Sequence, residues 1–155
     1  LMGKVLKDTC RQMWKTVVTI MSIMAMAKIM SHSGMIAEIA GMMVALTGSF
    51  YPAAAPFVGA IGTFVTGSGT SANVLFGGLQ VETAGSLGLD PSWLAGANTV
   101  GATIGKMISP QSIAIGTAAT ASVGSESKIL RKVIKYCVLF IIIAGLVAYA
   151  GSRFA

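Results

Sequence analysis

The feature that most constrains this chain is a polar, glycine-rich stretch at residues 62–78, GTFVTGSGTSANVLFGG, with apolar segments on both sides. At about 1.5 Å of helical rise per residue, the segment before its polar centre, 53–65, spans roughly 20 Å and the segment after it, 73–87, roughly 22 Å. The hydrocarbon core of a bilayer is about 30 Å thick, so neither segment crosses it comfortably. Together they predict a re-entrant hairpin over residues 53–87, whose polar turn must be buried in protein or line a wet cavity.

The composition indicates an integral membrane protein. Hydrophobic residues make up 54 % of the chain and charged residues only 10 %, whereas soluble domains carry about 25 % charged residues. The 19 glycines favour several closely packed helices over a single anchor. Most of the net charge of +6 lies in two basic flanks, 4–15 and 128–135, where membrane proteins carry topology signals, so it indicates no nucleic-acid partner. Cys10 and Cys137 lack metal-ligand spacing, and no disulfide, metal or cofactor is implied.

The apolar runs predict an all-α polytopic membrane protein that forms one transmembrane region. The expected segments are a basic flank at 1–15, transmembrane helices at 16–30 and 35–51, the re-entrant hairpin at 53–87, a discontinuous helix at 91–123, a basic loop at 124–132 and a final transmembrane helix at 133–150. Pro110 breaks the helix at 91–123 because proline lacks an amide hydrogen and clashes with the preceding turn. Asp90 and Ser109 are the expected N-caps of its two halves.

A hairpin followed by a broken helix is half of an inverted-repeat transporter core, in which substrate binds near the midplane between discontinuous helices. Three crossings would separate the two basic flanks, so both cannot be cytoplasmic. The charge rule works best for short loops and favours the second flank, at 128–135, as the cytoplasmic one.

Two helices are expected to begin in mid-membrane, one after the hairpin tip with Ser71 or Asn73 as N-cap, and one after the break with Ser109 as N-cap. Helix N-termini carry free amide hydrogens and partial positive charge, which favours an anion. Lys106, one turn before the break, is a candidate counter-charge to a substrate carboxylate. Hydroxyl and amide side chains supply further hydrogen bonds; the candidates are Thr66, Ser68, Thr70, Ser71 and Asn73 at the tip, and Ser109, Gln111 and Ser112 after the break.

Other interpretations account for the same residues. The hydroxyls could satisfy carbonyls of their own helices, and Lys106 could pair with a carboxylate outside this chain. A phosphate loop is excluded because its Lys-Ser/Thr ending is absent. A serine hydrolase is excluded because GxSxG does not occur and His32 is the only histidine, and no enzyme is indicated. A passive channel or a structural membrane subunit remains the alternative to a transporter.

Residues 62–80, GTFVTGSGTSANVLFGGLQ, and 97–118, ANTVGATIGKMISPQSIAIGTA, resemble the C-terminal region of bacterial L-lactate permeases, which include glycolate permeases. The resemblance covers nearly the whole chain. It implies a multi-pass secondary transporter of the bacterial plasma (inner) membrane that carries L-lactate and related 2-hydroxymonocarboxylates together with protons. It also implies that this chain is a C-terminal fragment whose partner is the missing N-terminal half of the permease. The site motifs carried over are 66–73 and 98–112, which adds Asn98 to the candidates.

One departure from the family concerns the proton. Some relatives carry an acidic residue at the position of Gly69, and no carboxylate of this chain is expected deep in the membrane. The proton-binding residue, the stereoisomer transported and the membrane orientation therefore stay open. A chain without its pseudo-symmetric half could also fold only as a homo-oligomer.

Overall fold

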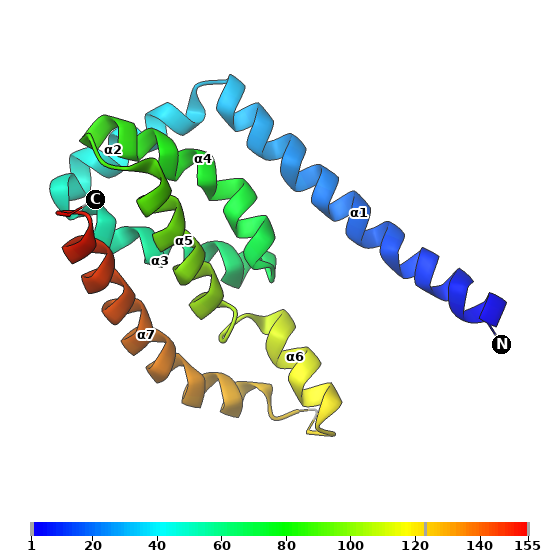
Figure 1. The fold of residues 1–155 in the computed structure, drawn as a ribbon. Coiled ribbons are helices and arrows are strands. Elements are labelled where there is room, and N and C mark those ends of the chain that lie inside the picture. Colours follow the sequence, from blue (N-terminus) through cyan, green and yellow to red (C-terminus); the bar gives the residue numbers. More distant parts are fainter. Residues whose placement is uncertain (1, 123, 155) are drawn as a thin grey trace.

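The computed structural model describes residues 2–122 and 124–154, and within these ranges every regular element is a helix, which confirms the all-helical class. The elements are α1 (Met2–His32), α2 (Met35–Thr47), the short 3-10 helix η1 (Gly48–Phe50), α3 (Tyr51–Thr66), α4 (Gly69–Leu87), α5 (Pro91–Gly105), α6 (Pro110–Ala119) and α7 (Glu126–Gly151). Helices α2 to α5 and α7 form a bundle, and α1 extends away from it (Figure 1).

Several of the expected boundaries differ from those observed. The helix expected at 35–51 ends at Thr47 as α2, and Tyr51 already begins α3 after the 3-10 turn. The discontinuous helix expected at 91–123 ends at Ala119 as α6. The basic flank at 1–15 and the helix expected at 16–30 form the single helix α1. The basic loop expected at 124–132 is wrong from residue 126 onward, because α7 begins at Glu126. Residues 126–135 are rich in charge, but they contain no glycine or proline, and Lys, Arg, Glu and Leu are good helix formers. Charge alone therefore did not separate a loop from the first turns of a helix.

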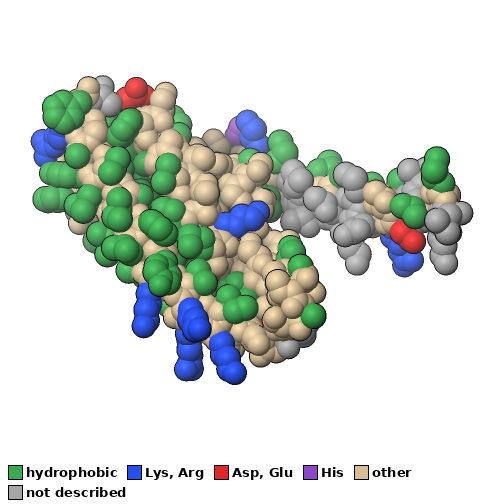
Figure 2. Space-filling model, turned by 60° about the horizontal axis from the view of Figure 1, so that its bottom comes forward, with side chains coloured by type: hydrophobic (Ala, Val, Ile, Leu, Met, Phe, Trp, Pro, Cys, Tyr) green, Lys and Arg blue, Asp and Glu red, His purple; other side chains and the backbone are tan. Residues whose placement is uncertain are grey.

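Two segments are long and apolar enough to cross a membrane, by length and composition. They are Met35–Thr66, which comprises α2, η1 and α3, and Glu126–Gly151, which is α7. Large apolar side chains on α7 are exposed, among them Val138, Ile142 and Leu146. Figure 2 shows hydrophobic side chains spread over one face of the bundle, with lysine and arginine side chains gathered at its edge. Such an apolar exterior suits contact with lipid.

Helices α3 and α5 pack backbone to backbone at the centre of the bundle. Gly101 lies against the carbonyl of Pro56 and Gly105 against that of Ala60, so that a β-carbon at either glycine would collide with main-chain atoms. Small residues allow this close approach between helices. Pro56 and Ala60 on α3 contact Gly101 and Gly105 on α5 in the same order, so the two helices are parallel. Consequently the hairpin turn after α3 and the break after α5 lie at the same end of the crossing.

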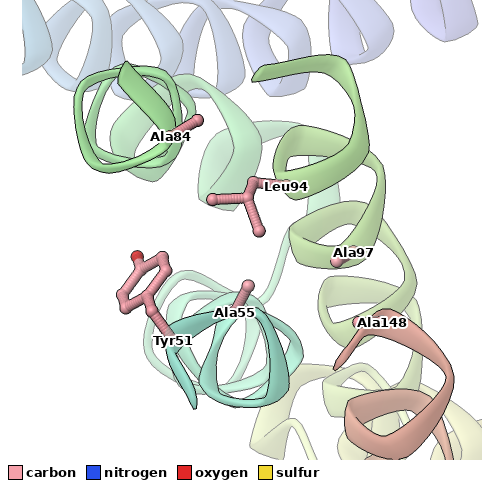
Figure 3. Packing of buried hydrophobic residues seen from close by; sticks show 6 residues of the cluster. All are labelled: Tyr51, Ala55, Ala84, Leu94, Ala97 and Ala148. Atoms are coloured by element: carbon pink, nitrogen blue, oxygen red, sulfur yellow. The ribbon is translucent and has the colours of Figure 1, made fainter. Parts of the chain in front are cut away.

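A small apolar core holds the opposite end of the helix pair. Its buried residues come from four helices (Figure 3): Tyr51, Ala55, Ala84, Leu94, Ala97 and Ala148. The indole Nε1 of Trp93 donates a hydrogen bond of 2.9 Å to the carbonyl of Ala148 and ties α5 to α7. Most of these side chains are alanine, so the core brings backbones close and positions the helices that carry the polar residues.

Candidate functional site

The hairpin turn consists of Gly67 and Ser68 between α3 and α4. Gly67 is left-handed, with φ 71°, and Ser68 is extended and caps α4 by accepting a 3.3 Å hydrogen bond from the amide of Ser71 at its Oγ. The expected caps, Ser71 and Asn73, are therefore wrong, because the left-handed glycine lets the helix begin earlier. The hydroxyl of Thr66 donates to the carbonyl of Gly62 at 2.8 Å and accepts from the amide of Ser68 at 3.2 Å, so the turn itself uses Thr66.

The break between α5 and α6 occupies residues 106–109. Ser109 is at the N-cap position of α6, as expected, but its side chain makes no capping hydrogen bond. Its Oγ is buried and has no partner within the described residues, and the same holds for Oγ1 of Thr63 on α3. At the other end of α5 the predicted cap is confirmed, since Oδ1 of Asp90 accepts from the amide of Ser92 at 2.7 Å.

A polar pocket of about 330 Å³ lies between the start of α4 and the last turns of α5. The residues that line it are Ser68, Gly69, Thr70, Asn73, Thr99, Ala102, Thr103 and Lys106. Four of them are candidates from the sequence, and none is acidic. Lys106 is exposed in this chain, so its ammonium group is available to a ligand in the pocket.

The first turn of α6 contacts the hairpin turn through one side chain. The side-chain Oε1 of Gln111, in the first turn of α6, occupies the space in which a β-carbon of Gly67 would lie. The left-handed conformation and this contact together require glycine at position 67. Two helix starts with free amide hydrogens therefore lie near Lys106, and all three features favour a negative charge.

A chain of buried hydrogen bonds leads into the pocket. The hydroxyl of Tyr51 donates to Oε1 of Gln80 at 3.0 Å, Nε2 of Gln80 donates to Oδ1 of Asn98 at 3.1 Å, and Nδ2 of Asn98 donates to Oδ1 of Asn73 at 2.9 Å. Tyr51 and Gln80 are completely buried and Asn98 is 1 % exposed. Asn73 is half-buried and lines the pocket. We refer to these four side chains as the amide chain.

The structure brings some of the predicted site residues together and separates others. Ser68, Thr70, Asn73 and Lys106 line one pocket, and Asn98 contacts it through Asn73. Ser71 instead lines a separate hollow beside Ile23 and Met24 of α1. Thr66, Ser109 and Gln111 do not line the polar pocket, and they contribute to the turn, the break and the contact between the two.

Four polar residues of this region were missed by sequence reasoning. Thr99 and Thr103 line the pocket with Lys106, and their spacing of four and three residues places all three on one helix face. Gln80 lies two turns after Asn73 on the same face of α4. These spacings were available signals. Tyr51 had none, because its contact with Gln80 joins two helices.

The fold and the pocket together are those of a helical membrane protein with an internal polar site. The L-lactate permease family model matches residues 2–153. The chain belongs to the L-lactate permease family, which is a family of transport proteins and not of enzymes.

Curated relatives support the same assignment. The chain is 42 % identical over 147 residues to an L-lactate permease of Bacillus subtilis, covering 95 % of this chain and 26 % of that protein. It is 54 % identical over 93 residues to an L-lactate permease of Streptococcus iniae, covering 60 % and 20 %. It is 42 % identical over 131 residues to the glycolate permease GlcA of Escherichia coli, covering 84 % and 23 %. The chain thus spans about a quarter of the length of these relatives. No solved structure matches it.

Proposed function

We propose that the protein containing this chain is a proton-coupled symporter of L-lactate and related 2-hydroxymonocarboxylates such as glycolate. Membership of the family supports this function, as do the printed names of the relatives, which are L-lactate and glycolate permeases. The observation that carries the proposal is the polar pocket, in which Lys106 and Asn73 lie at the N-terminus of α4 with no acidic lining residue. A passive channel or a structural subunit is the alternative.

The pocket suits the two functional groups of a 2-hydroxymonocarboxylate. Lys106 and the first amides of α4 supply positive charge for the carboxylate. The hydroxyl of Thr70 supplies a donor and an acceptor for the 2-hydroxyl group. The hydroxyls of Thr99 and Thr103 donate to the carbonyls of Ala95 and Thr99, at 2.9 and 3.0 Å, and therefore supply acceptors only. A volume of about 330 Å³ is large beside the roughly 30 Å³ of one water molecule, so a three-carbon acid fits with waters around it.

The proposed membrane arrangement follows from the helix lengths. Helices α3 and α4 form the re-entrant hairpin at 53–87, and α5 and α6 form the discontinuous helix, with both turns near the midplane. The chain is then a C-terminal part of a multi-pass permease of the bacterial plasma membrane. The remainder of that permease supplies the pseudo-symmetric half and closes the open side of the pocket, where Thr70, Thr99 and Lys106 are exposed.

The proton site is expected outside this pocket, because none of the residues that line it is a carboxylic acid or histidine. In this arrangement the pocket binds the anion, and a titratable group in the rest of the permease carries the proton. Coupling then comes from both halves of the whole protein.

Uptake into proteoliposomes tests the function. The full-length permease is reconstituted, an inward proton gradient is imposed, and uptake of labelled L-lactate is followed with and without a protonophore. We expect accumulation above the external concentration that collapses when the protonophore is added. Lactate uptake that does not change when the protonophore is added would contradict proton symport. A lactate flux that neither saturates nor accumulates lactate above the external concentration would indicate a channel.

A further inference from the structure

The amide chain has a direction. A carboxamide has one accepting end, its oxygen, and one donating end, its nitrogen. Gln80 accepts from Tyr51 and donates to Asn98, and Asn98 donates in turn to Asn73. Turning Asn98 alone would place nitrogen against nitrogen at Gln80 and oxygen against oxygen at Asn73. Turning Gln80 alone would place oxygen against oxygen at Asn98, and turning Asn73 alone would place nitrogen against nitrogen there. The three amides can therefore reverse only together.

The hydroxyl of Tyr51 decides between the two directions. In the observed direction it donates to Gln80. In the reversed direction it would have to accept from Gln80 and turn its proton to its second neighbour, Thr83, whose own hydroxyl donates to the carbonyl of Leu79 at 2.7 Å. A phenol is a good donor and a weak acceptor because its oxygen lone pairs are shared with the ring. Tyr51 and Gln80 are completely buried, so solvent cannot replace a missing hydrogen bond there. An amide end left without a partner is therefore costly.

The direction determines what Asn73 offers to the pocket. Its Oδ1 already accepts the hydrogen bond from Asn98, which leaves the Nδ2 donor for a ligand among the residues that line the pocket. In the reversed direction the oxygen would face the ligand and would repel a carboxylate.

We propose that Tyr51 is a positioning residue for substrate specificity: through Gln80 and Asn98 it holds the Asn73 amide with its donor toward the pocket, which favours a carboxylate over a neutral carboxamide. The inference rests on the proposed function and adds to it a specificity device built into the fold. Tyr51 itself lines no part of the pocket. Its influence on the ligand is transmitted by hydrogen-bond polarity.

The variant Tyr51→Phe removes the hydroxyl and keeps the ring in the core. Gln80 then loses its fixed donor, and both directions of the amide chain become populated. In the full-length permease, inhibition of labelled L-lactate uptake is measured with unlabelled L-lactate and with lactamide, its neutral carboxamide. Tyr136→Phe is the matched control, because Tyr136 is 60 % exposed.

We expect the KM for lactate to rise roughly 3- to 10-fold in Tyr51→Phe with Vmax nearly unchanged, the scale of one net hydrogen bond. Lactamide should inhibit lactate uptake by Tyr51→Phe at least as strongly as it inhibits uptake by the wild type, so that the preference for lactate over lactamide falls. Tyr136→Phe should retain the wild-type preference. An equal loss for both solutes would mean that Tyr51 only stabilises the fold, and an unchanged preference would likewise overturn the inference.

A double-mutant cycle with Asn73→Asp keeps the inference falsifiable. Aspartate accepts from Asn98 but has no donor for the ligand, so Asn73→Asp should lose the preference by itself. Tyr51→Phe should then add little in the Asn73→Asp background, since residues that act through one another are not additive. Full additivity would overturn the inference. If the wild-type permease took up no lactate, the proposed function and this inference would both fail. If the wild-type permease took up lactate and Tyr51→Phe kept the wild-type preference for lactate over lactamide, only this inference would fail.

Discussion

At the scale of single residues, the candidate site depends on one cation and on a few small or amide side chains. Lys106 is the charged residue among those that line the polar pocket of the described chain. The glycines of α5 have different surroundings although they lie on one helix. Gly101 contacts the backbone of Pro56, whereas a β-carbon built at Gly96 meets no atom within 4 Å among the described residues outside its own stretch of helix.

Replacing Lys106 by alanine should raise the KM for lactate about tenfold or more, because a charge-assisted hydrogen bond to the carboxylate is lost. Lys132→Ala is the matched control, since Lys132 is exposed on α7 and does not line the pocket. The measurement is the concentration dependence of lactate uptake by the full-length permease. Equal KM values for the two variants would remove Lys106 from the site.

Replacing Gly101 by alanine should destabilise the permease by about 1–3 kcal/mol, the usual cost of overpacking, because the methyl group meets the carbonyl of Pro56. Gly96→Ala should be neutral or slightly stabilising, since it has room and alanine favours a helix. Thermal unfolding in detergent compares the two variants. Similar melting temperatures would contradict the close parallel packing of α3 and α5.

At the scale of elements, the hairpin turn and the start of α6 are in contact through Gly67 and Gln111. The two helices of the hairpin and the interruption at Pro110 could be predicted from glycine, proline and apolar length, which act locally. The start of α4 at Ser68 could not, because several hydroxyl residues in a row were possible caps. The start of α7 could not either, because charged residues suit both a loop and an exposed helix turn.

The candidate site was only partly predictable from the sequence. Asn73 and Lys106 could be chosen because polar residues between apolar segments are rare. Thr99 and Thr103 share a helix face with Lys106, as their spacing indicates. Their approach to Asn73 depends instead on how α4 packs against α5, which no local pattern reports. Tyr51 belongs to the site region only through a contact with Gln80, 29 residues away.

Substitution of Gly67 by alanine should impair the turn for two separable reasons: strain at φ 71° and the collision with Gln111. We expect reduced lactate uptake and a lower melting temperature, with partial recovery in the double variant Gly67→Ala/Gln111→Ala. Gly77→Ala is the control, because space is open there among the described residues. The absence of any recovery would mean that Gln111 does not contribute to the effect.

At the scale of the whole molecule, this chain leaves surfaces that another part of the protein or lipid must cover. Large apolar side chains of α1, such as Met21, Met24 and Ile29, are exposed, and α1 extends from the bundle (Figure 1). The polar pocket is also open on one side. Both observations agree with a chain that spans about a quarter of the length of its relatives.

Helix α7 should cross the membrane completely, because its 26 residues extend about 39 Å. In a full-length permease without other cysteines, Ser127→Cys and Ser152→Cys should react with a membrane-impermeant maleimide from opposite sides. The basic residues after Ser127 favour the cytoplasm for that end. Labelling of both positions from the same side would contradict a crossing by α7.

The central claim is that substrate binds between the hairpin tip and the last turns of α5, and substrate protection tests it most directly. Cysteine is introduced singly at Thr70 and at Thr103 in the full-length permease, with Thr120→Cys as an exposed control outside this pocket. A small thiol reagent is added with and without saturating L-lactate. The account predicts that lactate slows labelling at Thr70→Cys and Thr103→Cys and leaves Thr120→Cys unchanged. Equal labelling rates with and without lactate at both pocket positions would contradict it.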